Sequence, residues 1–418
     1  MWSRKRFDID WRDLGYAALR CLVPGGASAD AGGVWLEPGR GGDLACLSVR
    51  SGFDLLLAAA AFPRGSEVLV SAMTIPDMVR IIREHGLVPV PLDLDPNLAF
   101  PPVAQIASRV TSRTRAVLIA HLFGATPPLD EHIAIARARK LLFIEDCAQA
   151  FRGRDYAGHP DADVSFFSFG TIKTATALGG AVARVRDGEL LARMRQGQAR
   201  HGVQSRAAYF GRIVKYMLLK TLSYRLPFQC LVGALRVLGR DHDRLLNSSV
   251  SGFVADRLFE LIRQQPCAPL LDTLRRRIGE FDGGRLLRHA ERGRRLARAL
   301  RGTYACPAAH VAPHAFWVFP ILTDTPDLLR RELARHGFDA TQGQSMIVVD
   351  PPTGREDLEP RETRRFLARI LFLPFYDALP DDELDRMAAV LAHFSATRAA
   401  LNGTPHAGES TAGGVLQD

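Results

Sequence analysis

The sequence lacks the features that mark metal-binding, disulfide-linked or membrane-spanning proteins. Its six cysteines are scattered without Cys-x-x-Cys spacing, which argues against a zinc site and against a disulfide framework. No apolar stretch reaches the about 20 residues that a membrane-spanning helix needs. The basic N-terminus continues into acidic residues where a secretory signal has its apolar core. We therefore expect a cytoplasmic protein that holds no metal.

Length and charge narrow the class further. The chain of 418 residues is 47% hydrophobic, enough for a large core and two lobes. Its net charge of +9 comes mostly from arginine, with runs at residues 275–277 and 292–301. Arginine runs at helical spacing without interleaved aromatic residues indicate solvated helix faces, so we expect no nucleic-acid partner. An anionic small substrate and a membrane surface both remain open.

Residues 51–185 alternate between expected helices and short apolar strands. Strands are expected at 67–72, 87–92, 115–121, 141–145, 163–169 and 181–185, and helices at 50–61, 75–85 (capped by Thr74) and 129–139. Almost continuously apolar strands indicate a sheet that is covered on both faces, hence an α/β fold with a mostly parallel, doubly wound sheet. Ligands of such sheets bind beyond the carboxyl ends of the strands.

The expected organisation has five parts. They are an N-terminal arm (1–44), a large domain (45–205), an apolar and basic helical insert (206–273), a small α/β C-terminal domain (274–395) and a disordered tail (396–418). The small domain is expected to hold an arginine-rich helix at 274–300, a strand at 314–322, a helix at 327–336, a strand ending at 372–374 and a last helix at 381–394.

The insert is the least regular part of the sequence. Residues 209–239 are typical of two short amphipathic helices that are punctuated by basic residues. A basic amphipathic helix can lie on an anionic membrane surface. Packing against the body of the protein or against a partner subunit is the commoner alternative, and both stay open.

A carboxylate and a lysine after successive apolar segments are the most informative residues. Asp146 follows the strand expected at 141–145, and Lys173 follows the strand expected at 163–169, ahead of Gly179 and Gly180. Pyridoxal phosphate chemistry needs this pair, because the lysine forms a Schiff base with the aldehyde while the carboxylate keeps the pyridine nitrogen protonated. The alternatives are a surface lysine and an aspartate that caps a helix.

Several blocks in a fixed order resemble the DegT/DnrJ/StrS family of sugar aminotransferases. The blocks are residues 49–56, 65–70, 89–96, 121–124, 143–149, 165–173, 201–202, 336–338 and 373–376. The resemblance covers about residues 45–205 well and 300–395 loosely. It implies a fold type I pyridoxal phosphate transferase with a large doubly wound domain and a smaller C-terminal domain.

The resemblance also assigns roles to residues around the cofactor ring. Lys173 forms the covalent link and moves the proton between the substrate carbon and the cofactor. Asp146 pairs with the pyridinium nitrogen, and Gln149 occupies the family's position beside the ring. A lysine at 173, where the dehydratase branch of the family has histidine, favours transamination over deoxygenation.

A second group of residues is implied to hold the phosphate. Ser168 matches the serine of the family's Ser-Phe-His block and donates a hydrogen bond, with a plain buried serine as the alternative. Gly52 and Phe53 offer backbone amides at a helix N-terminus, where the helix dipole favours an anion.

The chain also departs from the family pattern. Phe53 stands where the family has a threonine, Ile75 where many members have an aromatic residue, and Gly170 where the family has a histidine. The Gly-Tyr-Asn-Tyr-Arg block that reaches the neighbouring subunit's active site is absent, and residues 209–239 occupy that region. Substrate recognition is therefore the property that the resemblance predicts least well.

We expect a homodimeric aminotransferase that moves an amino group from glutamate to a keto-sugar. The sugar is nucleotide-linked or lipid-linked, in cell-envelope polysaccharide or secondary-metabolite biosynthesis. One alternative is a non-catalytic regulatory or scaffold protein that binds pyridoxal phosphate on the same fold. Another is an enzyme whose residues 209–239 contact the inner face of the membrane.

Overall fold

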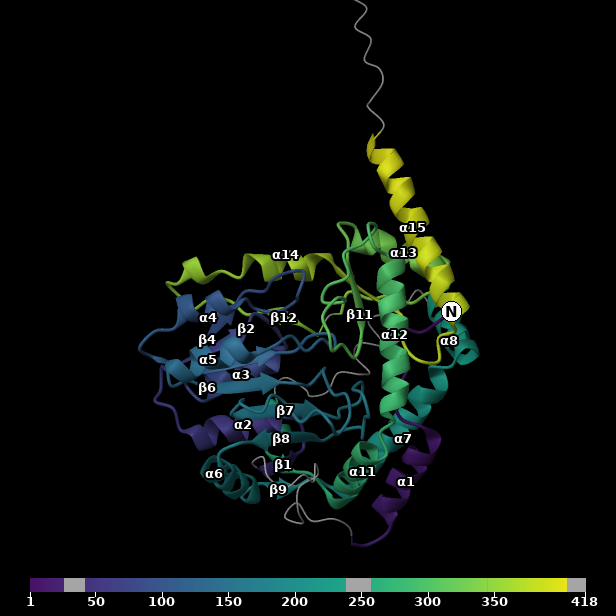
Figure 1. Ribbon diagram of the computed structural model, residues 1–418. Helices are drawn as coiled ribbons and strands as arrows, with labels where there is room; N and C mark the ends of the chain where they lie inside the picture. Colours follow the sequence, from purple (N-terminus) through teal and green to yellow (C-terminus); the bar gives the residue numbers. More distant parts are fainter. Residues whose placement is uncertain (26–41, 238–256, 344, 404–418) are drawn as a thin grey trace, which may run out of the picture.

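A seven-stranded sheet forms the centre of the computed structural model, which describes residues 1–25, 42–237, 257–343 and 345–403 (Figure 1). Its strands are β1 (Gly42–Cys46), β2 (Glu67–Ser71), β4 (Val88–Leu92), β5 (Thr114–Ala120), β6 (Leu142–Asp146), β7 (Val164–Ser168) and β8 (Ala181–Val185). Their order is β1-β8-β7-β6-β5-β2-β4. Strands β4, β2, β5, β6 and β7 are parallel, whereas β8 runs antiparallel to both β7 and β1.

Helices cover both faces of this sheet. The helices on one face are α2 (Val49–Ala60), α3 (Pro76–Glu84) and α6 (Gly188–Ala199), and those on the other are α4 (Val103–Arg109), α5 (Asp130–Ala138), α1 (Trp11–Leu22), α7 (Arg206–Leu222) and α11 (Ala268–Gly279). Successive strand residues point to opposite faces. Leu69 accordingly packs in one core and Val70 in the other, and both are buried. The doubly wound α/β prediction is confirmed.

The C-terminal lobe is built on a short antiparallel pair. Strand β11 (Phe319–Leu322) pairs with β13 (Ile370–Leu373), and the helices α12 (Gly283–Ala299), α13 (Pro326–Arg335) and α15 (Asp381–Gly403) surround them in one apolar cluster. The N-terminus joins this lobe, because the Trp2 amide donates to the Gly337 carbonyl at 2.7 Å and the indole is buried in the same cluster. Residues 1–9 therefore connect the small lobe to α1 on the large one.

The apolar, basic segment forms two helices as predicted. They are α7 and α8 (Arg225–Val237). Helix α7 packs in the large-lobe core through Tyr209, Ile213 and Tyr216, together with α1 and α11. None of the helices in the described part of the chain combines the length and the apolar character needed to cross a bilayer.

Shorter elements complete the fold. They are β3 (Met73–Thr74) paired with β12 (Ile347–Val348), β9 (Gly202–Val203) paired with β10 (Gln264–Gln265), α10 (Leu258–Ile262), the 3-10 helix η2 (Glu356–Leu358) and α14 (Arg361–Arg369).

The structure corrects four sequence-based expectations. Thr74 does not cap α3, because it pairs with Ile347 in a two-stranded sheet and Ile75 takes the cap position. The strand expected at 314–322 is confined to β11. The helix expected at 274–300 is two helices, because Asp282 caps a new one. Helix α15 continues through Gly403 into the tail expected to be disordered, since its Ala-rich sequence propagates a helix. Residues 404–418 lie outside the described chain, and the domain boundaries stay predictions.

Candidate active site

Lys173 lies on the turn that follows β7. Its amide donates to the Gly170 carbonyl at 3.0 Å. Helix α7 supports the loop after it, since the Tyr209 hydroxyl donates to the Ala177 carbonyl at 2.8 Å and Arg212 donates to the Leu178 carbonyl at 3.2 Å. The helix predicted as part of an insert therefore fixes the loop that carries the lysine.

The Lys173 ammonium group lies against an aromatic ring. Its Nζ is 4.0 Å from the centroid of Trp317, whose indole N–H donates to the Ile172 carbonyl at 2.9 Å. Burial, reinforced by the charge of Arg50, lowers the pKa of Lys173 to about 8 against the opposing effect of Asp146. A lysine with a lowered pKa is partly neutral near physiological pH, as a nucleophile or a general base requires.

Asp146 is the last residue of β6, the strand beside β7. One carboxylate oxygen accepts a hydrogen bond from the Ala148 amide at 2.9 Å. Burial raises the pKa of Asp146, while the Ala148 N–H and the charge of Lys173 oppose the rise. No ion pair joins Asp146 to Lys173 among the described residues, although each affects the pKa of the other. The two groups thus lie close enough to affect each other's pKa without forming an ion pair.

Ser168 and Gln149 flank these groups. Ser168 is the last residue of β7, and its hydroxyl accepts from the Gly170 amide at 3.4 Å. The Gln149 side-chain oxygen accepts from the Phe123 amide at 2.8 Å, which ties the turn after β6 to the turn after β5. Phe123 has a φ of 61°, a left-handed conformation that this hydrogen bond helps to hold.

The N-terminus of α2 differs in detail from the predicted phosphate site. The Gly52 amide donates to the Ser48 carbonyl at 3.0 Å, so it is engaged inside the helix. A Cβ at Gly52 would lie 2.8 Å from the Phe166 ring, so glycine lets α2 approach β7 closely. Phe53 is buried in the core. The first-turn residues of α2 are Val49, Arg50 and Ser51, and the cofactor roles of Gly52 and Phe53 stay predictions.

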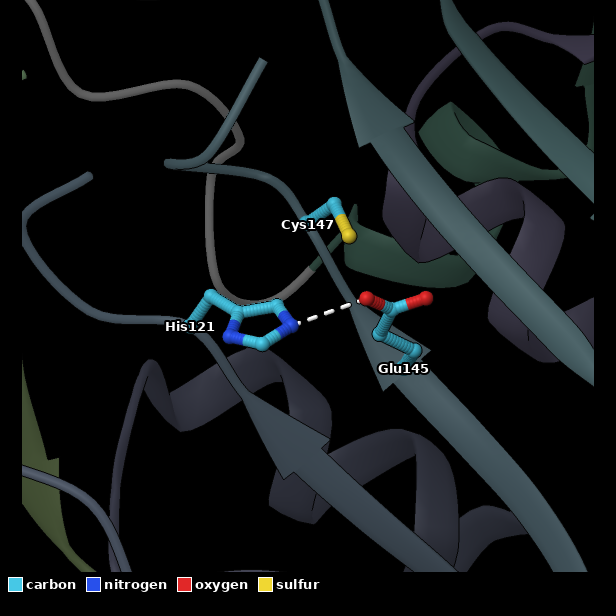
Figure 2. Close-up of side chains that lie close together, drawn as sticks. All are labelled: His121, Glu145 and Cys147. Carbon is cyan, nitrogen blue, oxygen red and sulfur yellow. Dashed lines mark hydrogen bonds and ion pairs between the residues drawn. The ribbon is translucent and has the colours of Figure 1, made fainter. Parts of the chain in front are cut away.

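The sequence neighbours of Asp146, Glu145 and Cys147, form a buried cluster with His121. Figure 2 shows the His121 ring directed at the Glu145 carboxylate, with the Cys147 sulfur close to both. Glu145 accepts from His121 Nε2 at 2.8 Å, the Ser165 hydroxyl at 2.6 Å, the His159 amide at 2.8 Å and the Tyr156 hydroxyl. Despite burial, which opposes the shift, the hydrogen bonds from His121, Ser165 and Tyr156 lower the pKa of Glu145 to about 2.

This cluster contains residue types that bind metal ions, but its carboxylate has no oxygen lone pair left for an ion. An ionised carboxylate has about four acceptor positions. Glu145 uses them on four protein donors, so no lone pair is left for a cation. The ionised Glu145 also makes His121 Nε2 a donor, which leaves the buried Nδ1 without a hydrogen-bond partner.

Sequence reasoning missed three residues near Lys173. The charge of Arg50 lowers the pKa of both Lys173 and Asp146. Arg50 also forms an ion pair with Asp77 at 2.5 Å. Trp317 of the small lobe lies against Lys173, and Lys5 of the N-terminal segment lies against Trp317. Arg50 adjoins the Ser51-Gly52 motif and was within reach of sequence reasoning. Nothing in the sequence relates Lys5 to Trp317.

Part of the chain is similar to known sugar aminotransferases. Residues 42–236 match the DegT/DnrJ/EryC1/StrS aminotransferase family. GDP-perosamine synthase of Escherichia coli O157:H7 is 33% identical over 136 residues, which are 32% of this chain and 37% of that protein. GDP-perosamine synthase of Caulobacter vibrioides is 29% identical over 224 residues, 52% of this chain and 58% of that protein. The chain thus spans about two fifths to three fifths of the length of these curated relatives.

Solved structures match over nearly the whole chain. Helicobacter pylori PseC, an aminotransferase involved in the biosynthesis of pseudoaminic acid, has a TM-score of 0.66 at 14% identity and covers 95% of this chain and 99% of its own. The putative sugar aminotransferase Spr1654 from Streptococcus pneumoniae, in its PMP form, has a TM-score of 0.67 at 15% identity, with 96% and 99% coverage. Likeness at this identity shows the fold.

The fold is that of fold type I pyridoxal phosphate transferases, as expected. Residues 42–236, just under half of the chain, match the model of the DegT/DnrJ/EryC1/StrS aminotransferase family, and the resemblance seen in the sequence is confirmed over that stretch. The family match runs through α7 and most of α8, the segment that was expected to be an insert.

Proposed function

We propose that the protein is a pyridoxal phosphate-dependent aminotransferase that moves an amino group from glutamate to a keto-sugar. The observation that carries this proposal is the placement of Lys173 and Asp146 at the carboxyl ends of adjacent strands, coupled electrostatically but not in contact. The relatives named as nucleotide-sugar enzymes support a keto-sugar acceptor. Its identity and its carrier, nucleotide or lipid, are the finer part of the proposal.

The residues present fit the cofactor. Lys173, Asp146, Gln149 and Ser168 are each partly buried, whereas their neighbours Glu145, Cys147, Phe167 and Phe169 are fully buried. Side chains that line a ligand site show this pattern, because part of their surface is left for the ligand. The α2 N-terminus adds the amides of Val49 and Arg50, since Ser48 accepts from those of Ser51 and Gly52. No acidic residue lies in the first turn to repel a phosphate.

Each residue then has a task in the reaction. Pyridoxal phosphate, when bound, supplies an aldehyde for the amine and a ring that accepts electron density. Lys173 would hold that aldehyde through Nζ and would then move the proton at the substrate carbon. The Asp146 carboxylate holds a proton on the pyridine nitrogen. The Val49 and Arg50 amides of α2, the Ser168 hydroxyl and the Arg50 guanidinium would hold the phosphate.

The absorption spectrum tests this function directly. The purified protein with pyridoxal phosphate should show a cofactor band that glutamate bleaches, and Lys173→Ala should show neither the band nor the bleaching. A band that forms but resists glutamate would support the alternative of a non-catalytic binding or scaffold protein. Nucleotide-linked and lipid-linked keto-sugars, offered separately to the glutamate-treated enzyme, should distinguish the acceptors, because only the true one restores the band.

We also propose that the protein acts as a homodimer. The support is the resemblance to the family, which implies active sites that are shared between subunits. Light scattering of the eluting protein should give twice the mass of 45.9 kDa, and a monomer that turns over would refute the proposal.

Membrane contact is the second candidate property, and a specific surface favours it. Helices α1 and α7 lie side by side and antiparallel, because Trp11 contacts Tyr224 at one end and Arg206 contacts the Val23 carbonyl at the other. In Figure 1 they run along one flank of the molecule. Both present exposed apolar side chains, and we define the α1–α7 face by them: Trp11, Leu19, Leu22, Val214 and Leu218.

The charge of this region favours a lipid surface over a second copy of the chain. Residues 206–237 contain six basic residues and no acidic one. A two-fold dimer contact through this face would bring positive charges of the two subunits together, which is unfavourable. An anionic bilayer would instead attract them. Trp11 and Tyr224 are residue types that favour the membrane interface. We propose that this face rests on the inner surface of the cytoplasmic membrane.

Vesicle sedimentation tests the α1–α7 face. The double variant Leu22→Glu and Leu218→Glu should lose binding to phosphatidylglycerol vesicles that the unaltered protein sediments with. Leu287→Glu is the matched control, since Leu287 on α12 is 70% exposed and lies outside the face. Unchanged sedimentation of the double variant would refute membrane contact. A change from dimer to monomer without lipid would identify the face as a subunit interface.

A further inference from the structure

The N-terminal segment brings a second lysine to the catalytic one. Two contacts fix the segment on either side of Lys5. Before it, Arg4 pairs with Asp339 at 2.9 Å on the small lobe. After it, Asp8 accepts from the Ala175 amide at 2.6 Å, two residues beyond Lys173. Lys5 is therefore held in place by both lobes.

Lys5 and Lys173 lie against the same indole. The Lys5 Nζ is 4.0 Å from the Trp317 ring centroid and donates to the Trp317 carbonyl at 2.8 Å. The Lys173 Nζ is also 4.0 Å from that centroid. The two ammonium nitrogens are therefore separated by at most about twice this distance, close enough for the charge of Lys173 to act on the pKa of Lys5.

No carboxylate neutralises Lys5 within the described residues. The nearest candidate, Asp8, gives its oxygens to Arg285 at 2.6 Å and to the Ala175 amide. Burial and the charge of Lys173 lower the pKa of Lys5 well below its usual value, and Asp8 only opposes this. Two cations brought together out of water are costly unless an anion joins them. An anionic group beside Trp317 would offset the repulsion between the two lysines.

We propose that Lys5 and Trp317 form a subsite for a carboxylate of the amino donor. The inference rests on the proposed function and adds the residue that recognises the donor. A carboxylate or a phosphate oxygen would suit Lys5 equally in charge. The donor's carboxylate is favoured because it sits one bond from the carbon that bears the amino group. The phosphate of a sugar substrate is separated from the reacting carbon by the sugar ring.

Separate half-reactions test the assignment. In Lys5→Met, the glutamate concentration needed for half-maximal bleaching of the cofactor band should rise roughly ten- to a hundredfold, the effect of losing one charged hydrogen bond. The limiting rate of bleaching should change much less, because Lys173 still moves the proton. Lys5→Arg should restore most of the affinity. In the cofactor-free protein, calorimetry should show weaker binding of glutarate to Lys5→Met.

Lys220→Met is the matched control. Lys220 is also partly buried and donates to a backbone carbonyl, that of Ile9 at 2.7 Å, and it lies near a different tryptophan, Trp11. It should leave the glutamate dependence unchanged. An unaltered cofactor band and melting temperature in Lys5→Met show that the variant is folded; if it is not, Lys5→Gln replaces it.

Two outcomes would overturn the proposal. Glutarate binding and glutamate dependence equal to those of the unaltered protein would remove Lys5 from donor binding. A defect confined to the second half-reaction, with the keto-sugar, would assign the anion to the acceptor's phosphate. Failure of the proposed function is distinguishable, because the unaltered protein would then not bleach with glutamate, while glutarate binding would still report on Lys5.

Discussion

Two neighbouring carboxylates on β6 have opposite environments. Glu145 is fully buried and accepts from four protein donors, and its pKa falls to about 2. Asp146, the next residue, is partly buried, and burial raises its pKa. Adjacent strand residues point to opposite sides of the sheet, so one strand end places the two groups in separate surroundings.

This difference separates a structural carboxylate from a ligand-binding one. The protein supplies Glu145 with all the hydrogen bonds it can accept, so Glu145 fixes the loops around it. Asp146 keeps most of its capacity for a group from outside. A pattern of Glu-Asp in sequence does not show which residue has which task. The two environments predict different consequences when each is altered.

The largest effect is expected for Asp146→Asn. Loss of the negative charge removes the partner of the pyridine nitrogen and should lower the rate of transamination by about 10²–10⁴-fold. The melting temperature at neutral pH should rise, because a costly buried charge is gone. Steady-state kinetics and thermal unfolding measure both. Asp161→Asn on the surface is the control, and an active Asp146→Asn enzyme would contradict the assignment.

Glu145→Gln should show the opposite pattern. The amide cannot satisfy four donors, so buried groups of His121, Ser165 and Tyr156 lose partners, and stability should fall by about 3 kcal/mol. Denaturant unfolding measures this loss. Glu291→Gln, at an exposed site on α12, should change stability little. A stable but inactive Glu145→Gln protein would mean that Glu145 acts in the chemistry.

The pH dependence of stability should separate the two carboxylates again. The folded pKa of Glu145 lies below its usual 4.5, so its contribution is full above about 4.5 and is lost as pH falls toward about 2. The gap in melting temperature between the native protein and Glu145→Gln should therefore narrow in that window.

The contribution of Asp146 to stability should change with pH in the opposite direction. Its folded pKa is raised, so its ionised form costs stability at neutral pH, and this cost disappears as pH falls through the folded value. Asp146→Asn should thus be the more stable protein at neutral pH, with an advantage that shrinks in acid. An advantage that grows in acid would contradict the environment described for Asp146.

A smaller effect concerns Lys173 as a nucleophile. With a pKa of about 8, the rate at which the cofactor-free protein captures pyridoxal phosphate should rise with pH and level off above about 8. An ordinary lysine would continue to gain up to its usual 10.5. Stopped-flow absorbance measures the profile. Arg50→Met should move the plateau to higher pH, because the charge of Arg50 contributes to the lowered value.

Metal should have no effect. Since the oxygens of Glu145 are occupied, dialysis against a chelator and later addition of zinc should leave the melting temperature and the cofactor band unchanged. A stabilisation by stoichiometric zinc that disappears in Cys147→Ser would show that the cluster opens to bind an ion.

The sequence predicted what depends on local pattern. Apolar runs located the sheet strands, and the order of Asp146, Ser168 and Lys173 indicated the cofactor. Contacts between distant segments were out of reach: Lys5 meets Trp317 across 312 residues. Thr74 looked like a helix cap, but its pairing with Ile347 depends on a segment far along the chain. Nothing local distinguished Glu145 from Asp146, because their hydrogen-bond partners come from different loops.

Trp317 also gives the protein an internal optical probe. Its ring is 4.0 Å from the Lys173 nitrogen, where the cofactor would be attached. At such a separation a coloured group on Lys173 would take up the indole's excitation energy almost completely. Trp317→Phe, compared with the native protein, would isolate this signal from the three other tryptophans. Loading and release of the cofactor become observable as changes in emitted light, without labelling and at concentrations too low for absorbance.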